Sequence, residues 1–170
     1  DFESIESIKR ASVVIDCTPS GIGHLNKLKY YDDFKNNVKG FLAQGSEDGF
    51  GKKDARGIND KALAASDQFI QIVSCNTHNI SCITNTLTLN EDPDNLIEGK
   101  YLCIRRANDL SQPDSFIPSP QVGVHDDMQY GSHHAADAAD LFSTLGMDLN
   151  LFSSATVSYT HLTLPTICSV

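Results

Sequence analysis

A cysteine at the junction of an expected strand and an expected helix is the residue best placed for chemistry in this sequence. Residues 69–73 are mostly β-branched or aromatic, as in a buried strand, and residues 80–87 carry apolar side chains at helical spacing. Asn76 and Thr77 favour a helix N-terminus, so Cys75 should lie just before the helix. The N–H groups and dipole there favour a nucleophilic thiolate. A small cysteine packed in a core fits the stretch equally well.

Two glycine-containing turns follow two further expected strands. CTPSGIG comes after the strand expected over 11–16, and AQGSEDG follows the strand expected over 38–43. Ligands of open α/β sheets bind at the carboxyl ends of the strands, where glycine lets the backbone come close to a ligand. Both turns are therefore candidate binding loops, although many glycine turns serve only to reverse the chain.

Arginine and histidine pairs provide two further candidate anion sites. Arg105 and Arg106 end a strand expected over 101–106, where their guanidinium groups could bind phosphate or carboxylate, or simply face solvent. His133 and His134 begin an expected helix, whose N-terminus could hold a phosphate. Adjacent histidines diverge on a regular helix or strand, so we prefer a phosphate site and expect no metal. A capped helix start with solvated polar groups is the simpler alternative.

The composition indicates a soluble globular protein with an acidic surface. Of the 170 residues, 40% are hydrophobic and 21% are charged, and the net charge is −9. The chain has no basic patch and no apolar run of membrane-spanning length, so we expect neither nucleic acid nor membranes as partners. Its five scattered cysteines, with no CxxC pair, suit a reducing cytoplasm rather than disulfides or structural zinc.

The order of the expected elements predicts an α/β fold. We expect helices over 4–10, 25–34, 55–66, 76–87 and 134–145, and strands over 11–16, 38–43, 69–74 and 101–106. Strands that alternate with helices favour βαβ units and a parallel sheet. We therefore predict the C-terminal half of a Rossmann-like parallel sheet in residues 1–74, followed by the start of an α+β domain in residues 75–156.

The end of the chain has an unusual sequence. Residues 157–170 read VSYTHLTLPTICSV, which resembles a translated sequencing adapter. We treat these residues as a non-native tail and assign no role to His161 or Cys168. The alternative is a genuine strand, since the composition would allow one.

Five short motifs together resemble the archaeal-type (type II) glyceraldehyde-3-phosphate dehydrogenases. They are IDCTPSGIG, AQGSE, VSCNTHN, IRRAND and GSHHAAD, and they occur in the family's order and spacing across most of residues 11–140. The chain departs from the family pattern at His78-Asn79, which replaces Thr-Gly, and at Ser46, which replaces a second glycine. The resemblance therefore indicates a divergent branch of this family.

The resemblance implies roles for individual residues at the substrate. Cys75 matches the catalytic nucleophile, and Ser74 and Asn76 match its two neighbours, which contact the aldehyde. His133 and His134 match a pair implied in binding the substrate phosphate.

The resemblance also implies a cofactor, NAD or NADP, between which the sequence does not choose. Gly45 and Ser46 match a glycine pair near the nicotinamide, and Thr18-Pro19 matches the turn that lines the cofactor. Arg106 matches an arginine at the cofactor and the active site.

The implied reaction belongs to glycolysis and gluconeogenesis. A phosphorylated aldehyde becomes a cysteine thioester with hydride transfer to NAD(P), and inorganic phosphate releases the product. The family is homotetrameric, and the resemblance implies that this chain is an inactive fragment, without the upstream glycine-rich fingerprint and the downstream base histidine. The alternatives are a related cysteine-dependent semialdehyde or acyl-phosphate reductase, and a non-catalytic binding protein on the same scaffold.

Overall fold

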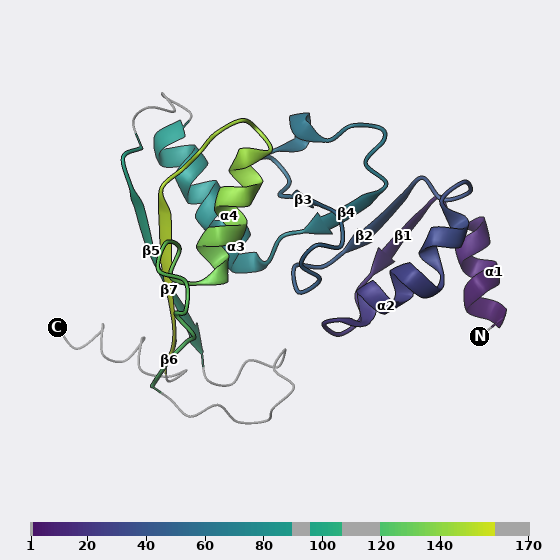
Figure 1. Ribbon diagram of the computed structural model, residues 1–170, viewed down its shortest axis with the longest axis horizontal. Helices are drawn as coiled ribbons and strands as arrows, with labels where there is room; N and C mark the ends of the chain where they lie inside the picture. The colour runs from purple at the N-terminus through teal and green to yellow at the C-terminus, as the bar shows by residue number, and fades with distance from the viewer. Residues whose placement is uncertain (1, 90–95, 107–119, 159–170) are drawn as a thin grey trace, which may run out of the picture.

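The computed structural model describes residues 2–89, 96–106 and 120–158 (Figure 1). The α-helices are α1 (Phe2–Arg10), α2 (Ile22–Lys29), α3 (Cys75–Thr84) and α4 (His133–Ser143). The strands are β1 (Val13–Asp16), β2 (Gly40–Ala43), β3 (Lys52–Asp54), β4 (Phe69–Ile72), β5 (Gly99–Arg106), β6 (Gln121–Val122) and β7 (Leu151–Ser158). Shorter turns are the 3-10 helices η1 (Tyr31–Phe34) and η2 (Asp60–Ala62) and the π-helix η3 (Asn85–Leu89).

The first sheet is parallel, as the sequence predicted. Its strand order is β1-β2-β4-β3, and every neighbouring pair is parallel. Asp16 of β1 lies opposite Ala43 of β2, which lies opposite Gln71 of β4. The carboxyl ends of these strands therefore meet at one edge, where ligands of open α/β sheets bind.

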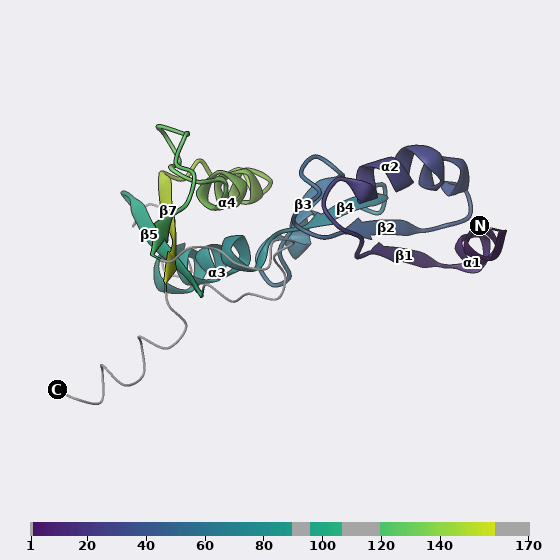
Figure 2. The same ribbon diagram turned by 90° about the horizontal axis from the view of Figure 1, so that it is seen from below.

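Aromatic side chains fill the core on one face of this sheet. The rings of Tyr31 and Phe41 stack with centroids 4.9 Å apart, and Phe41 stacks on Phe69 at 5.0 Å. Phe50 meets Phe69 edge to face at 5.5 Å. Helix α2 lies over this face of the sheet (Figure 2). On the opposite face Ile15 is 69% exposed.

The second sheet lies beside helices α3 and α4. Its strand order is β5-β7-β6, with β5 and β7 parallel over eight residue pairs and β6 antiparallel to β7. Helices α3 and α4 pack against one another beside this sheet (Figure 1). Their shared core consists of Ile80, Leu89, Ala135, Ala138, Phe142, Leu149 and Leu151. A partial parallel sheet followed by a mixed α/β unit matches the predicted fold class.

The prediction missed three strands, β3, β6 and β7. The sequence indicated a glycine-rich loop over residues 44–53, but β3 occupies Lys52–Asp54 at the sheet edge. Its charged side chains hide the strand pattern because each lysine has a distant partner: Lys52 pairs with Asp67 and Lys53 with Asp137. Strand β7 was also missed, and it includes the first two residues of the suspected tail.

Helix α2 differs from the helix expected over 25–34. It begins at Ile22, because the Glu47 carboxylate accepts hydrogen bonds from Gly21 N (2.6 Å) and His24 N (3.0 Å) at its start. The helix ends at Lys29, and a 3-10 turn follows. Leu25 and Leu28 are exposed, whereas Tyr31 is buried.

Smaller differences affect the other helices. Helix α3 ends at Thr84 and continues as the π-helical turn η3, rather than running regularly to residue 87. The helix expected over 55–66 is only the 3-10 turn η2. Residues 107–119, most of the expected proline-containing loop, and residues 159–170 of the tail lie outside the described residues. Within the described part of the chain, no helix is long and apolar enough to span a bilayer.

Candidate functional site

A cavity of about 430 Å³ lies at the carboxyl ends of β1, β2 and β4. Residues 15–17, 42–46 and 72–75 line it. The structure therefore brings Gly45 and Ser46 to the same cavity as Ser74 and Cys75, although these two pairs are far apart in the sequence. The position agrees with the rule that α/β sheets bind ligands at this edge.

Gly45 permits the close approach of two chain segments at this cavity. A Cβ atom at residue 45 would lie 2.7 Å from Ser74 Cα and 2.9 Å from Val73 C. Real Cβ atoms do not come this close to backbone, so the loop after β2 can abut the start of α3 only without a side chain.

Cys75 is the first residue of α3 rather than the residue before the helix. Ser74 is the N-cap, with its Oγ accepting from Thr77 N at 3.3 Å. Cys75 is an exposed free thiol, which excludes the core role. The first N–H groups of a helix have no partner within the helix, so the backbone around the thiol can donate to a negatively charged group.

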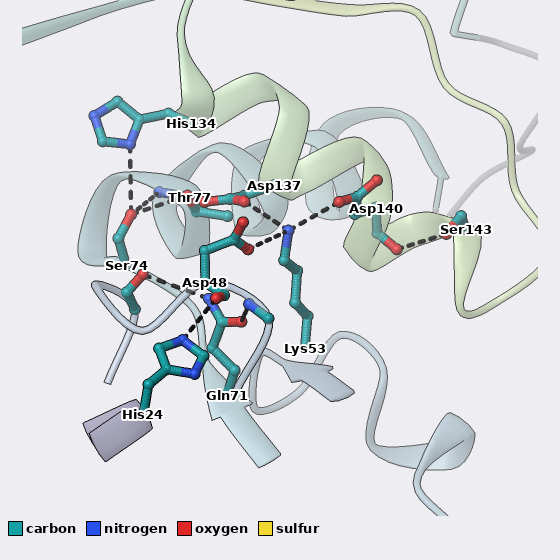
Figure 3. A network of polar contacts seen from close by, with 12 residues as sticks. His24, Asp48, Lys53, Gln71, Ser74, Thr77, His134, Asp137, Asp140 and Ser143 are labelled. Carbon is teal, nitrogen blue, oxygen red and sulfur yellow. Dashed lines mark hydrogen bonds and ion pairs between the residues drawn. The ribbon is translucent and has the colours of Figure 1, made fainter. Parts of the chain in front are cut away.

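His134 of α4 contacts both neighbours of Cys75. Figure 3 shows the contact with Ser74. Its Nε2 accepts from Asn76 Nδ2 at 3.2 Å, so in the neutral ring the proton lies on Nδ1, which faces Ser74 Oγ at 3.4 Å. Burial lowers the pKa of His134 to about 4, and the nearby positive charges of His133 and Arg105 add to this effect. At neutral pH His134 is therefore an uncharged hydrogen-bonding group.

His133 and Arg105 lie near His134. The exposed His133 ring lies 3.9 Å from the His134 ring, measured between centroids. Arg105 of β5 is close enough to influence the His134 charge. Arg106 is the last residue of β5, and its side chain lies outside the described residues. Both histidines thus lie beside the Cys75 segment, whereas Arg106 is placed by its backbone alone.

The N-terminus of α4 is not capped by its own N-cap residue. Ser132 makes no side-chain cap, and its Oγ instead pairs with Ser153 Oγ of β7 at 2.6 Å. Ser153 Oγ accepts from Ala135 N at 3.0 Å. Ser153 of β7, a residue distant in the sequence, therefore caps the start of α4.

The turn after β1 is held by Asp16, a buried residue that sequence reasoning did not select. Its carboxylate accepts hydrogen bonds from Thr18 N (2.9 Å) and Thr18 Oγ1, from Asn26 Nδ2 (3.0 Å) and from Tyr31 OH (2.7 Å). Burial alone would raise the pKa of Asp16, but these hydrogen bonds outweigh it and lower the pKa. A carboxylate that closes the apolar run VVID is a signal that could have identified it.

Thr18 lies beside the cavity. Gln44, which lines the cavity, donates from Nε2 to Thr18 O at 2.5 Å. Pro19 follows in the same turn, where Ile22 N donates to Pro19 O at 3.0 Å. The turn Thr18-Pro19 therefore adjoins the Gly45 segment.

Lys53 is a second residue that the sequence did not reveal. Its ammonium lies 2.7 Å from Asp137 Oδ1, 2.8 Å from Asp140 Oδ2 and 3.3 Å from Asp48 Oδ1 (Figure 3). The aspartates come from α4 and from the loop after β2.

Among the described residues, no group of three or more histidine, cysteine, aspartate or glutamate side chains could hold a metal ion.

Comparison with curated proteins finds glyceraldehyde-3-phosphate dehydrogenases. The chain is 34% identical to that of Archaeoglobus fulgidus over 88 residues, which are 49% of this chain and 24% of the relative. It is 32% identical to that of Sulfolobus acidocaldarius over 166 residues, covering 94% of this chain and 43% of the relative. Glyceraldehyde-3-phosphate dehydrogenase 2 of Methanosarcina acetivorans is 29% identical over 138 residues, 78% of this chain and 37% of that protein.

The similarity is modest and covers part of each relative. The chain spans less than half the length of these curated proteins. No protein-family model matches it. These relatives are all named glyceraldehyde-3-phosphate dehydrogenases, and the chain is similar to them at 28–34% identity.

Proposed function

We propose that this chain carries the nucleophile of a phosphorylating glyceraldehyde-3-phosphate dehydrogenase, and that Cys75 is that nucleophile. The observation that carries the proposal is the position of Cys75. It is an exposed thiol at the start of α3, at the cavity formed by the carboxyl ends of three parallel strands. The similar dehydrogenases independently support the same chemistry.

The first step is attack of the Cys75 thiolate on the aldehyde carbon. A C–S bond forms, and the carbonyl π-electrons move to oxygen to give the oxyanion of a thiohemiacetal. Backbone N–H groups at the start of α3 can donate to this oxyanion. The Asn76 side-chain amide has two N–H groups. One donates to His134 Nε2, so the other can donate to the substrate.

The cavity fits the nicotinamide end of a dinucleotide. Gly45 lets the loop after β2 abut the start of α3, and the Thr18-Pro19 turn adjoins the same loop, so these segments lie around one cavity. When bound there, NAD or NADP would supply the acceptor for the hydride of the thiohemiacetal carbon. Ser46, Gly45 and the Thr18-Pro19 turn would orient this ring, and the resemblance assigns Arg106, the last residue of β5, to the cofactor site as well.

Release requires inorganic phosphate. A phosphate oxygen attacks the thioester carbon, the C–S bond breaks, and the electrons return to Cys75 as the thiolate while the product leaves as an acyl phosphate. His134 is neutral and its two ring nitrogens face Ser74 and Asn76, so it orders these residues beside the substrate, whereas Arg105 contributes positive charge for the phosphate groups. His133, exposed at the start of α4, completes the anion site.

We further propose the division of labour along the chain. Residues 1–74 belong to an NAD(P)-binding domain and residues 75–156 to a catalytic domain. The partners are a phosphorylated aldehyde and inorganic phosphate, and the whole protein is a cytoplasmic homotetramer.

Site-resolved alkylation tests the role of Cys75. The purified chain is treated with iodoacetamide at neutral pH, and mass spectrometry follows each cysteine separately. Cys82 is the internal control, because it is exposed on the same helix but lies two turns from its start. We expect Cys75 to react at least ten times faster than Cys82. Equal rates would argue for an inert thiol and a non-catalytic binding protein.

A further inference from the structure

Lys53 contacts Asp48 of the loop between β2 and β3, which we call the cavity loop, and Asp137 of α4, the helix that carries His133 and His134. The proposed reaction assigns no role to Lys53. We propose that Lys53 is a positioning residue: its ion pair with Asp137 fixes the start of α4 so that His134 meets Ser74 and Asn76 beside Cys75. The inference deepens the proposed function and rests on it.

The Lys53–Asp137 contact is the buried part of the ion-pair cluster. The side chains are 14% and 13% exposed, and Nζ lies 2.7 Å from Asp137 Oδ1. Asp140 and Asp48 are 66% and 77% exposed, so water screens their attraction to the ammonium. Burial alone would lower the pKa of Lys53, but hydrogen bonds to Asp137 and Asp140 outweigh it and raise the pKa. Lys53 therefore stays charged.

Asp137 lies one helical turn from the histidine pair. It follows His134 by three residues and His133 by four, so a shift of Asp137 moves both. The His134 contacts with Asn76 and Ser74, at 3.2 Å and 3.4 Å, are near the upper limit for hydrogen bonds. A small displacement of α4 would break them.

A second contact holds the other end of α4 to the same strand. Asn59 is fully buried, and its Nδ2 donates to Lys53 O (2.9 Å) and to Thr144 Oγ1 (3.0 Å) just after α4. The C-terminal end of α4 thus has its own attachment to β3. The Lys53 ammonium is left to fix the N-terminal half, where the histidines lie.

The cavity loop forms the third side of the cluster. Asp48 follows Ser46 by two residues, and its backbone oxygen contacts His24 Nε2 at 2.8 Å. Gly49 N donates to Gln71 Oε1 of β4 at 3.0 Å. The loop is therefore attached to the first sheet. Lys53 pairs with Asp48 of this loop and with Asp137 of α4, so it fixes α4 relative to the first sheet.

The titration of His134 reports its position. The groups around its ring are His133 on α4, Arg105 on β5, and Ser74, Cys75 and Asn76 at the start of α3. All of them are retained in variants of residues 53 and 137. NMR of the imidazole then measures whether the ring stays buried, with a wild-type pKa of about 4.

Two variants separate positioning from simple electrostatics. Lys53→Met removes a positive charge, and Asp137→Asn removes a negative charge. If the pair positions α4, both variants expose His134 and raise its pKa by at least one unit. If the pair acts only through its electric field, the pKa of His134 rises in Lys53→Met and falls in Asp137→Asn.

The controls keep the result interpretable. Lys53→Arg should leave the His134 titration unchanged, because guanidinium also pairs with carboxylate. Lys52→Met removes the neighbouring lysine, which pairs with Asp67 at 3.0 Å, and should also leave it unchanged. If Lys53→Met fails to fold, the nearly isosteric Asp137→Asn variant decides alone by its upward shift.

A His134 pKa that stays constant in both variants, or that moves in opposite directions, overturns the inference. Cys75 alkylation in the same samples tests the proposed function separately. An unreactive Cys75 with a shifted His134 would contradict the function while leaving the positioning intact.

Discussion

The side chains next to Cys75 divide two tasks at the residue scale. His134 is buried and neutral, so it orders Ser74 and Asn76 by hydrogen bonds. Arg105 provides positive charge beside it. In the proposed reaction, Arg105 would therefore provide the charge for a phosphate, while His134 orders the residues around the Cys75 thiol.

The buried His134 predicts a loss of stability in acid. Its folded-state pKa of about 4 lies below the usual value of 6.5, so between these values the unfolded chain binds the extra proton. The free energy of unfolding should therefore fall as the pH falls from 6.5 to 4, by on the order of 2–3 kcal/mol from this group. Urea unfolding of the wild type and of His134→Gln across this range measures the difference.

The comparison of the two proteins isolates the histidine from the acidic groups, which both share. His24→Gln, which removes a histidine from another part of the chain, should keep the wild-type dependence. Parallel pH profiles for the wild type and His134→Gln would contradict a buried neutral imidazole.

Gly45 gives a second prediction at the residue scale. In Gly45→Ala the new Cβ meets the Ser74 backbone, so the loop or α3 must move. We expect a loss of roughly 1–3 kcal/mol in the free energy of unfolding and slower alkylation of Cys75. Gly40→Ala is the control, because its Cβ has 3.8 Å to the nearest atom. Equal effects of the two substitutions would refute the close approach.

At the scale of elements, strand ends and helix starts are held by distant residues. Glu47 accepts from the backbone at the start of α2, Ser153 caps α4, and Asp16 joins β1 to Asn26 and Tyr31. Each contact fixes an element at the edge where the cavity lies. The site is therefore built from tertiary contacts as much as from local sequence.

Asp16 supports the turn between β1 and α2. In Asp16→Ala the buried Tyr31 hydroxyl and Thr18 N–H lose their acceptor, which should cost roughly 2–4 kcal/mol. Asp16→Asn keeps one acceptor oxygen and should lose less. Urea denaturation curves measure both, and a change below about 0.5 kcal/mol in the alanine variant would show that water replaces the carboxylate.

At the scale of the whole molecule, the sequence predicted the pattern of the fold better than its edges. Apolar runs identified β1, β2, β4 and β5, and strand–helix alternation identified the parallel sheet. It did not identify β3, because Lys52 and Lys53 are stabilised by aspartates far along the chain. The hydrophobic pattern of a short segment cannot predict ion pairs with residues so distant in the sequence.

The candidate site shows the same division. Cys75, Gly45 and the histidine pair follow from types and spacing, and the structure places them around one region. Asp16 and Lys53 depend on which strands become neighbours, so only the folded chain reveals them.

The most direct test of the central claim is substrate protection of Cys75. Iodoacetamide labelling is followed at Cys75 and Cys82 with glyceraldehyde-3-phosphate, and in parallel with glyceraldehyde, which lacks the phosphate. If Cys75 attacks a phosphorylated aldehyde held by the histidine and arginine side chains, glyceraldehyde-3-phosphate should slow labelling of Cys75 at least fivefold more than glyceraldehyde and leave Cys82 unchanged. Equal protection by both aldehydes, or none, would contradict the assignment.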